Sequence, residues 1–352
     1  MDAPLAAPVE RALIEAVLRG DTGYADAGGL PEAFAGFAER RFGWTVDAGS
    51  LMLIADIITG VEVALQTVTV PGDSVVISTP VYGPYFHHIE LLGRKVISSP
   101  LSYDSGAYRL DLDRLAQDFA RGARAYVLCN PHNPTGLVFS RDQLQQIGRL
   151  ADEFGVAVIA DEVFAPLTAP GVVHVPFATI DAEAAARGFS VQGASKAWNL
   201  AGLKAALLCP GPQADRSRMR QELTVGASML GVLASEAAFN DGEEWLDQVR
   251  AGIAERSDLL SCLLARSLPT VRYQPPAGTY LAWLNLRACG VGDDPAAVLQ
   301  ERGRVALYSG LYFGAEGRGF ARLNLATSRA ILTEAVARMS RVLVVQGSSS
   351  QW

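Results

Sequence analysis

Cysteine and histidine are scarce in this chain, which has 4 of each among its 352 residues. No CxxC pair occurs, and the first three cysteines lie in or beside apolar runs, so we expect buried reduced thiols rather than a disulfide framework or a zinc site. His87 and His88 are sequence neighbours that would point in different directions on a helix, and no HExxH spacing occurs. The sequence therefore indicates no metal centre. The four cysteines are Cys129, Cys209, Cys262 and Cys289.

Positive charge is also in deficit. Lys and Arg total 30 against 37 Asp and Glu, for a net charge of −7. A chain with this balance has no long-range basic field to attract nucleic acid or anionic lipid. No stretch of about 18 residues is free of charges and turn formers, and the amino terminus lacks a basic segment followed by an apolar run. We expect a cytoplasmic protein that binds neither nucleic acid nor membranes.

Apolar residues, by contrast, are plentiful. Hydrophobic residues make up 49% of the chain and charged residues 19%, a composition too apolar for a disordered chain. At about 150 residues per domain, the length predicts one large or two medium-sized domains.

The centre of the chain predicts an α/β fold. From residue 57 to residue 209, short β-branched runs alternate with longer segments of helical period, which is typical of a mostly parallel sheet with helices on both faces. Ser140 and Gln143 form a predicted capping box at the start of one helix. The expected strands are 74–78, 95–98, 125–129, 156–160, 188–192 and 204–208, and the expected helices are 57–68, 85–92 and 141–154.

After about residue 241 the pattern changes to a long helical stretch, strand-like segments at 278–286 and 322–326, and a final helix. These features indicate a smaller second domain of α+β type. We expect an amino-terminal segment at 1–20 that packs with the small domain, a large domain at 21–241, the small domain at 242–346 and a tail at 347–352.

Polar side chains follow three of the predicted strands, at the point where each strand ends. They are Asn133, Asp161 and Lys196. Singly, these residues could be a turn former, a helix cap and a surface amine. Because the carboxyl ends of parallel strands share one edge of a sheet, where ligands of open α/β folds bind, we expect the three to converge. Helix starts meet at the same edge and favour an anion such as phosphate.

The motifs around these residues resemble those of fold type I pyridoxal 5′-phosphate (PLP) enzymes, in the class I and II aminotransferase superfamily. Within it, the chain is most similar to MalY/PatB-type cystathionine β-lyases, which are carbon–sulfur lyases, and the resemblance spans nearly the whole sequence. It implies PLP as the cofactor. The matching stretches are NPHNPTG (130–136), ADEV (160–163), ASKAWNLAGLK (194–204), PAGTYLAW (276–283), FGAEGRGFARLNLA (313–326) and RLNLATSR (322–329).

The resemblance implies a role for each catalytic position. Lys196 would bond to the aldehyde of the cofactor and later act as the base that moves the substrate Cα proton. Asp161 would pair with the pyridine nitrogen and keep it protonated. Tyr82 matches the aromatic residue that stacks on the ring, although it could also be a core aromatic. Asn133 would donate a hydrogen bond to the ring phenolate oxygen.

The phosphate and the substrate have their own implied partners. The phosphate would bind the backbone amides at the start of the predicted 57–68 helix, with a hydroxyl and a positive charge added from the lysine motif. Arg322 matches the arginine that binds the substrate α-carboxylate, although an interface ion pair is an alternative. Tyr24 resembles the tyrosine that reaches the phosphate of a neighbouring subunit, which implies a homodimer. The residues implied around the phosphate are Ala55, Asp56, Ile57, Ser195 and Lys204.

Two features depart from the family pattern. Phe164 stands where family members often have Tyr or His that can approach the phenolate oxygen, and a phenylalanine can only pack there. Family members also usually begin with an arm that ends in a stretch like WVAEMD and helps to line the substrate pocket, whereas this sequence starts at the equivalent of its last two residues, Met1 and Asp2. We expect the site to be partly open on that side.

The main interpretation is a PLP-dependent carbon–sulfur β-lyase that converts a small amino-acid substrate, an L-cysteine conjugate such as cystathionine, into a thiol, pyruvate and ammonia. An aminotransferase is the first alternative, because it needs the same lysine, aspartate and arginine. A PLP tailoring enzyme of secondary metabolism would fit Phe164 and the missing arm. The intact site residues disfavour a binding or regulatory protein, and a nicotinamide dehydrogenase is disfavoured because no GxGxxG follows a strand.

Overall fold

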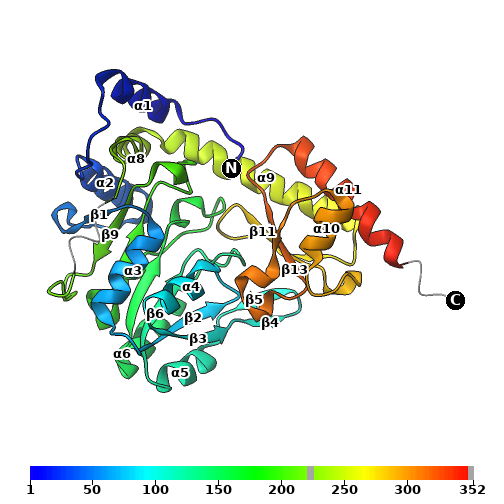
Figure 1. Ribbon diagram of the computed structural model, residues 1–352, viewed down its shortest axis with the longest axis horizontal. Helices are drawn as coiled ribbons and strands as arrows, with labels where there is room; N and C mark the ends of the chain where they lie inside the picture. The colour runs from blue at the N-terminus through cyan, green and yellow to red at the C-terminus, as the bar shows by residue number, and fades with distance from the viewer. Residues whose placement is uncertain (220–225, 348–352) are drawn as a thin grey trace.

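The structure of the chain, a computed structural model, describes residues 1–219 and 226–347, with side chains as far as residue 343. Two sheets organise it (Figure 1). We refer to the described residues from 21 to 241, around the seven-stranded sheet, as the large domain, and to residues 242–347, around the four-stranded sheet, as the small domain. The expected tail lies outside the described residues except for Gly347. No helix in the described part is long and apolar enough to cross a membrane.

The large sheet has the strand order β1-β9-β8-β7-β6-β2-β3. Strands β8, β7, β6, β2 and β3 are parallel, whereas β9 runs antiparallel to β8 and β1 antiparallel to β9. The predicted mostly parallel α/β sheet is therefore confirmed. The strands are β1 (Met52–Ile54), β2 (Ser74–Thr79), β3 (Lys95–Pro100), β6 (Ala123–Cys129), β7 (Ala157–Asp161), β8 (Phe189–Gln192) and β9 (Ala206–Pro210).

Helices cover both faces of this sheet because successive strand residues point to opposite sides. Val75 and Ile77 of β2 pack into the core beneath one helical layer, and Val76 between them packs into the core of the other. The predicted capping box of Ser140 and Gln143 is confirmed. The first layer contains α3 (Ile57–Val68) and α4 (Pro84–Leu91), and the second contains α5 (Leu112–Ala120), α6 (Arg141–Phe154) and α7 (Glu183–Arg187).

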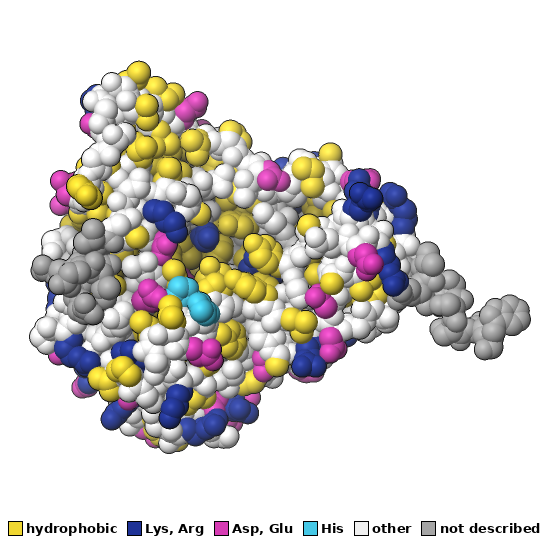
Figure 2. Space-filling view, in the orientation of Figure 1, with side chains coloured by type: hydrophobic (Ala, Val, Ile, Leu, Met, Phe, Trp, Pro, Cys, Tyr) yellow, Lys and Arg dark blue, Asp and Glu magenta, His cyan; other side chains and the backbone are white. Residues whose placement is uncertain are grey.

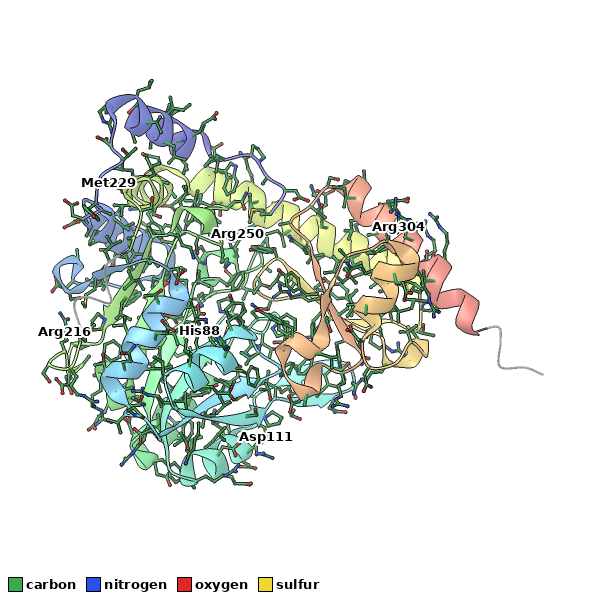
Figure 3. The ribbon with its side chains drawn as sticks, in the orientation of Figure 1. His88, Asp111, Arg216, Met229, Arg250 and Arg304 are labelled. Atoms are coloured by element: carbon green, nitrogen blue, oxygen red, sulfur yellow. The ribbon has the colours of Figure 1, made fainter. Side chains whose placement is uncertain are left out.

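The small domain has an antiparallel sheet of order β10-β11-β13-β12. Arg250, labelled in Figure 3, ties this domain to the large one, because its Nε donates to the carbonyl of Thr168 at 2.8 Å. A buried core that includes Phe34, Trp198 and Leu284 is continuous across both domains. The elements are α9 (Glu243–Ser267), β10 (Arg272–Tyr273), β11 (Leu281–Asn285), α10 (Pro295–Gly303), β12 (Tyr308–Ser309), β13 (Phe320–Asn324) and α11 (Arg329–Gly347).

The amino-terminal segment packs differently from the expectation. Its helix, α1 (Ala7–Arg19), lies on α8 (Met229–Asp241) of the large domain rather than on the small domain (Figure 1). The reason is that Val9 of α1 is buried in the same apolar core as Val232 and Ala238 of α8. Ile14, Val17 and Leu18 of α1 remain exposed. The first residues reach the small domain: the N–H of Asp2 donates to the carbonyl of Ala326 at 2.8 Å, and its carboxylate accepts from Thr327 Oγ1 at 2.7 Å. The remaining elements are α2 (Leu30–Phe42), which packs with α8, and the hairpin of β4 (Ser102–Asp104) and β5 (Ala107–Arg109).

Candidate active site

A cavity of about 500 Å³ lies where the carboxyl ends of the parallel strands meet the small-domain sheet. In Figure 2, hydrophobic and basic side chains surround a recess near the centre of the face shown. A cavity of this size falls within the usual range for small-molecule sites, about 300–1,000 Å³. All the predicted site residues but one line it, namely Ala55, Asp56, Ile57, Tyr82, Asn133, Asp161, Ser195, Lys196, Lys204 and Arg322.

Asp161 is the buried acid of the cavity. It is the last residue of β7, one position beyond the predicted strand, and it is 5% exposed. One carboxylate oxygen accepts from the N–H of Val163 at 3.1 Å, and the other accepts from the hydroxyl of Tyr85. Burial raises the pKa of Asp161, and these hydrogen bonds oppose the rise. The orientation of the carboxylate is thus fixed, and any cation or N–H that binds beside it would lower its pKa.

Lys196 follows β8 and lines the same cavity. Burial lowers the pKa of its amine, although the charge of Asp161 partly opposes this. A lysine with a lowered pKa is neutral more of the time at pH 7, which makes it a better nucleophile and base.

Arg322 and Asn133 join the two domains across the cavity. Arg322 lies in β13, and its Nη1 donates to Asn133 Oδ1 at 2.8 Å. Its guanidinium carbon is 4.4 Å from the ring centroid of Tyr308 and 4.8 Å from that of Phe313. Burial lowers the pKa of Arg322, but a guanidinium stays charged in proteins. These contacts fix a forked donor that can bind a carboxylate through two hydrogen bonds.

The start of α3 forms another wall of the cavity. Asp56 is the N-cap residue, and its Oδ1 accepts from the N–H of Thr59 at 3.0 Å, while Lys204 Nζ donates to Oδ2 at 2.7 Å. Burial would raise the pKa of Asp56, but the hydrogen bonds from Lys204 and Thr59 outweigh it and the pKa is lowered. The negative charge of Asp56 is thus engaged by the helix and by Lys204, while the backbone of Ala55, Asp56 and Ile57 opens a helix whose N-terminus attracts anions.

Of the two tyrosines predicted to lie at the site, one lines the cavity and the other does not. Tyr82 lines the cavity, and its ring stands edge-to-face against Tyr85 with 5.5 Å between centroids. Burial raises the pKa of Tyr82 to about 12, so its phenol stays protonated. Tyr24 does not line the cavity of its own chain. Its backbone forms a bridge with Ser228, and the residue is 99% exposed.

Several cavity residues were not predicted. Tyr85 forms the hydrogen bond to Asp161, and no local pattern in the sequence indicates this contact between residues 76 positions apart. Phe164 packs edge-to-face against Tyr280 at 5.6 Å between centroids, as expected of a residue that can only pack. The other additions to the wall are Ile58, Cys129, Val163, Ala201, Ala205, Leu281, Tyr308, Tyr312 and Asn324.

The donor set of this cavity fits PLP. An amine that can bond to an aldehyde, a buried acid that can pair with a pyridine nitrogen and a helix N-terminus that can hold a phosphate all line one space. Residues 6–339 match the family described as aminotransferase class I and II. The chain belongs to the class I and II aminotransferase family. Its relatives include a Mycobacterium tuberculosis (strain H37Rv) protein, itself named only provisionally as a cystathionine β-lyase, which is 41% identical over 98% of this chain and 90% of its own length.

Two further comparisons extend this result. Cystathionine β-lyase PatB of Bacillus subtilis (strain 168) is 34% identical over 89% of this chain and 82% of its own. The PLP-bound C–S lyase of Staphylococcus hominis is 25% identical, with a TM-score of 0.89 over 98% of this chain and 90% of its own. Membership in the aminotransferase family confirms the predicted PLP-dependent fold type I, and PLP is the cofactor.

Proposed function

We propose that this aminotransferase-family protein is a PLP-dependent carbon–sulfur β-lyase, which converts an L-cysteine conjugate and one water into a thiol, pyruvate and ammonia. The observation that carries the proposal is the one cavity shared by Lys196, Asp161, Asn133 and Arg322. Relatives named cystathionine β-lyase and C–S lyase favour this reaction over amino transfer. An aminotransferase and a tailoring enzyme of secondary metabolism are the alternative functions, and their products would differ.

Each cavity residue has a separate proposed role at the cofactor. When bound, PLP accepts the electron pair left at the substrate Cα after a proton is removed. Lys196 would take that proton, a role supported by its lowered pKa and its place in the cavity. Asp161 would pair with the pyridine nitrogen from the end of β7, and Tyr82 would pack on the ring.

The phosphate would bind at the start of α3. The backbone amides of Ala55, Asp56 and Ile57 supply donors there, and the hydroxyl of Ser195 adds another. Lys204 contributes positive charge only in part, because it is paired with Asp56.

Arg322 would bind the substrate α-carboxylate. The hydrogen bond from Arg322 to Asn133 Oδ1 leaves the amide group of Asn133 to donate to the phenolate oxygen of the cofactor. The same pair therefore positions the cofactor and the carboxylate relative to each other.

Replacing Arg322 by lysine should raise KM, since lysine keeps the charge but can make only one of the two parallel hydrogen bonds. Loss of one hydrogen bond to a charged group predicts an increase of about tenfold to a hundredfold. Steady-state kinetics with L-cystathionine measures it. The matched control is Arg318→Lys, because Arg318 is 64% exposed and pairs with Asp293, and an equal KM for the two variants would contradict the role of Arg322.

Product analysis tests the reaction itself. Incubation of the purified protein with a panel of cysteine conjugates and ordinary amino acids should release free thiol, pyruvate and ammonia in equal amounts. Accumulation of pyridoxamine phosphate and a keto acid without thiol would instead identify an aminotransferase. A product that retains the substrate sulfur and amino group would identify a tailoring enzyme.

We also propose that the protein is a homodimer in which Tyr24 binds the phosphate of the neighbouring site. The exposure of Tyr24 in the single chain supports this, as does its bridge to Ser228, whose N–H donates to the carbonyl of Lys204 at 2.8 Å. The Tyr24→Phe variant should bind PLP about tenfold more weakly, which is the effect of one hydrogen bond to an anion, with its dimer intact by sedimentation equilibrium. A fully active monomer would contradict the proposal.

A cytoplasmic location is the third part of the proposal. All four cysteines are free thiols, which is typical of a reducing compartment. Three are buried as expected, whereas Cys262 is exposed, contrary to the expectation. Cell fractionation should recover the lyase activity with cytoplasmic markers, and recovery in a secreted fraction would contradict it.

A further inference from the structure

Asp161 and Tyr85 form a buried hydrogen-bonded pair at the back of the cavity. Tyr85 lies in the first turn of α4, is 1% exposed and donates its hydroxyl hydrogen to Asp161. The sheet explains the pairing. Asp161 lies beside Cys129 in the β6–β7 register, and Cys129 packs into the core beneath α3 and α4 together with Tyr85. With the N–H of Val163 on its other oxygen, the carboxylate is held from two directions.

The hydrogen bond has a defined polarity. A tyrosine has one O–H donor, and burial together with the charge of Asp161 raises the pKa of Tyr85 well above its usual value, so the phenol does not ionise. Donation to a carboxylate favours its ionised form. Other charges act on Asp161: that of Lys196 favours the ionised form, and that of Glu162 opposes it. Tyr82 is a further ionisable group near Asp161, whose charge helps to raise the pKa of that phenol. The thiol of Cys129 lies alongside and is kept neutral by burial, which raises its pKa.

We propose that Tyr85 is a positioning residue for PLP: its hydroxyl keeps Asp161 ionised and aimed at the pyridine nitrogen. Tyr85 acts through Asp161. The inference rests on the proposed role of Asp161, but it holds equally for a lyase and an aminotransferase because both need a protonated ring.

The test is the protonation of the pyridine nitrogen in the holoenzyme, measured by nitrogen NMR with isotopically labelled PLP. In Tyr85→Phe the carboxylate becomes more basic, so the proton shared by Asp161 and the ring moves toward Asp161. The ratio of protonated to neutral nitrogen should fall by about tenfold, the effect of losing one hydrogen bond to a charged group. The nitrogen signal then moves toward that of neutral pyridine, and kcat falls while KM is retained.

Two further variants control for the loss of a buried hydroxyl and for poor folding of Tyr85→Phe. Tyr126→Phe removes an equally buried hydroxyl, which contacts Ser78 Oγ at 2.9 Å away from Asp161, and should leave the signal unchanged. Incorporation of 3-fluorotyrosine at position 85 keeps the ring and makes the donor more acidic, so the signal should move in the opposite direction even if Tyr85→Phe folds poorly. A wild-type signal in both position-85 variants would overturn the inference. If Asp161→Asn also leaves the signal unchanged, the role of Asp161 itself has failed.

Discussion

Replacing Lys196 by alanine should lower kcat by about a thousandfold or more. A positioned general base alone contributes about a hundredfold to ten thousandfold, and this variant also loses the amine that bonds to the cofactor. Turnover with L-cystathionine under saturating PLP measures the effect. The variant should still bind PLP through the start of α3, because the anion site does not involve the Lys196 amine.

Lys204→Ala is the matched control for this prediction. Lys204 lines the same cavity eight residues later, but its amine is paired with Asp56 at 2.7 Å. Its loss should weaken the affinity for PLP and leave kcat of the loaded enzyme within a fewfold of wild type. Equal losses of kcat in the two variants would contradict a specific role for Lys196.

The Asp161→Asn variant should lower kcat by about a hundredfold to a thousandfold, the range found when one group that stabilises developing charge is removed. Asparagine has nearly the same shape but no negative charge, so it cannot hold the ring nitrogen protonated. Steady-state kinetics and the nitrogen NMR signal of bound PLP measure the two consequences together.

The control for Asp161 is another buried aspartate. Asp118 is 1% exposed and accepts from Arg114 Nε at 2.9 Å and Arg121 Nη1 at 3.1 Å, on α5 in the helical layer of the opposite sheet face. Asp118→Asn should reduce the free energy of unfolding, measured by urea denaturation, and leave kcat unchanged. A comparable loss of kcat in both variants would mean that the Asp161 effect is one of folding.

Interactions between residues close in the sequence allowed much of the fold to be predicted. Helices α3 and α6 begin and end at the predicted residues. Asp56 and Ser140 cap their first turns through contacts within a few positions, and Gly155 in the left-handed region ends α6. Strand β9 begins two residues later than predicted, since Lys204 has a φ of 55° in the left-handed region, which no pattern of side chains indicates. Strand β1 was not predicted, because its three residues are organised only by pairing with β9.

The candidate site could also be predicted in part from the sequence. Lys196, Asp161 and Asn133 converge because parallel strands end at one edge, and that rule operates on sequence order alone. The partner of Asp161 was missed because Tyr85 reaches it from α4, across the sheet face, where the register of β6 and β7 decides which side chains meet. The placement of α1 on α8 likewise depends on the assembled domains rather than on the helix itself.

Lys196 should carry the cofactor, and one measurement tests this directly. The purified holoenzyme is treated with borohydride, which reduces the bond between the lysine amine and PLP and makes it permanent. The protein is then digested with a protease, and the peptide masses are measured by mass spectrometry. We expect the yellow absorption band to disappear and the mass of reduced PLP to be found on the peptide that contains Lys196. A PLP mass on another lysine, or a colourless protein that gains no mass at all, would contradict the account.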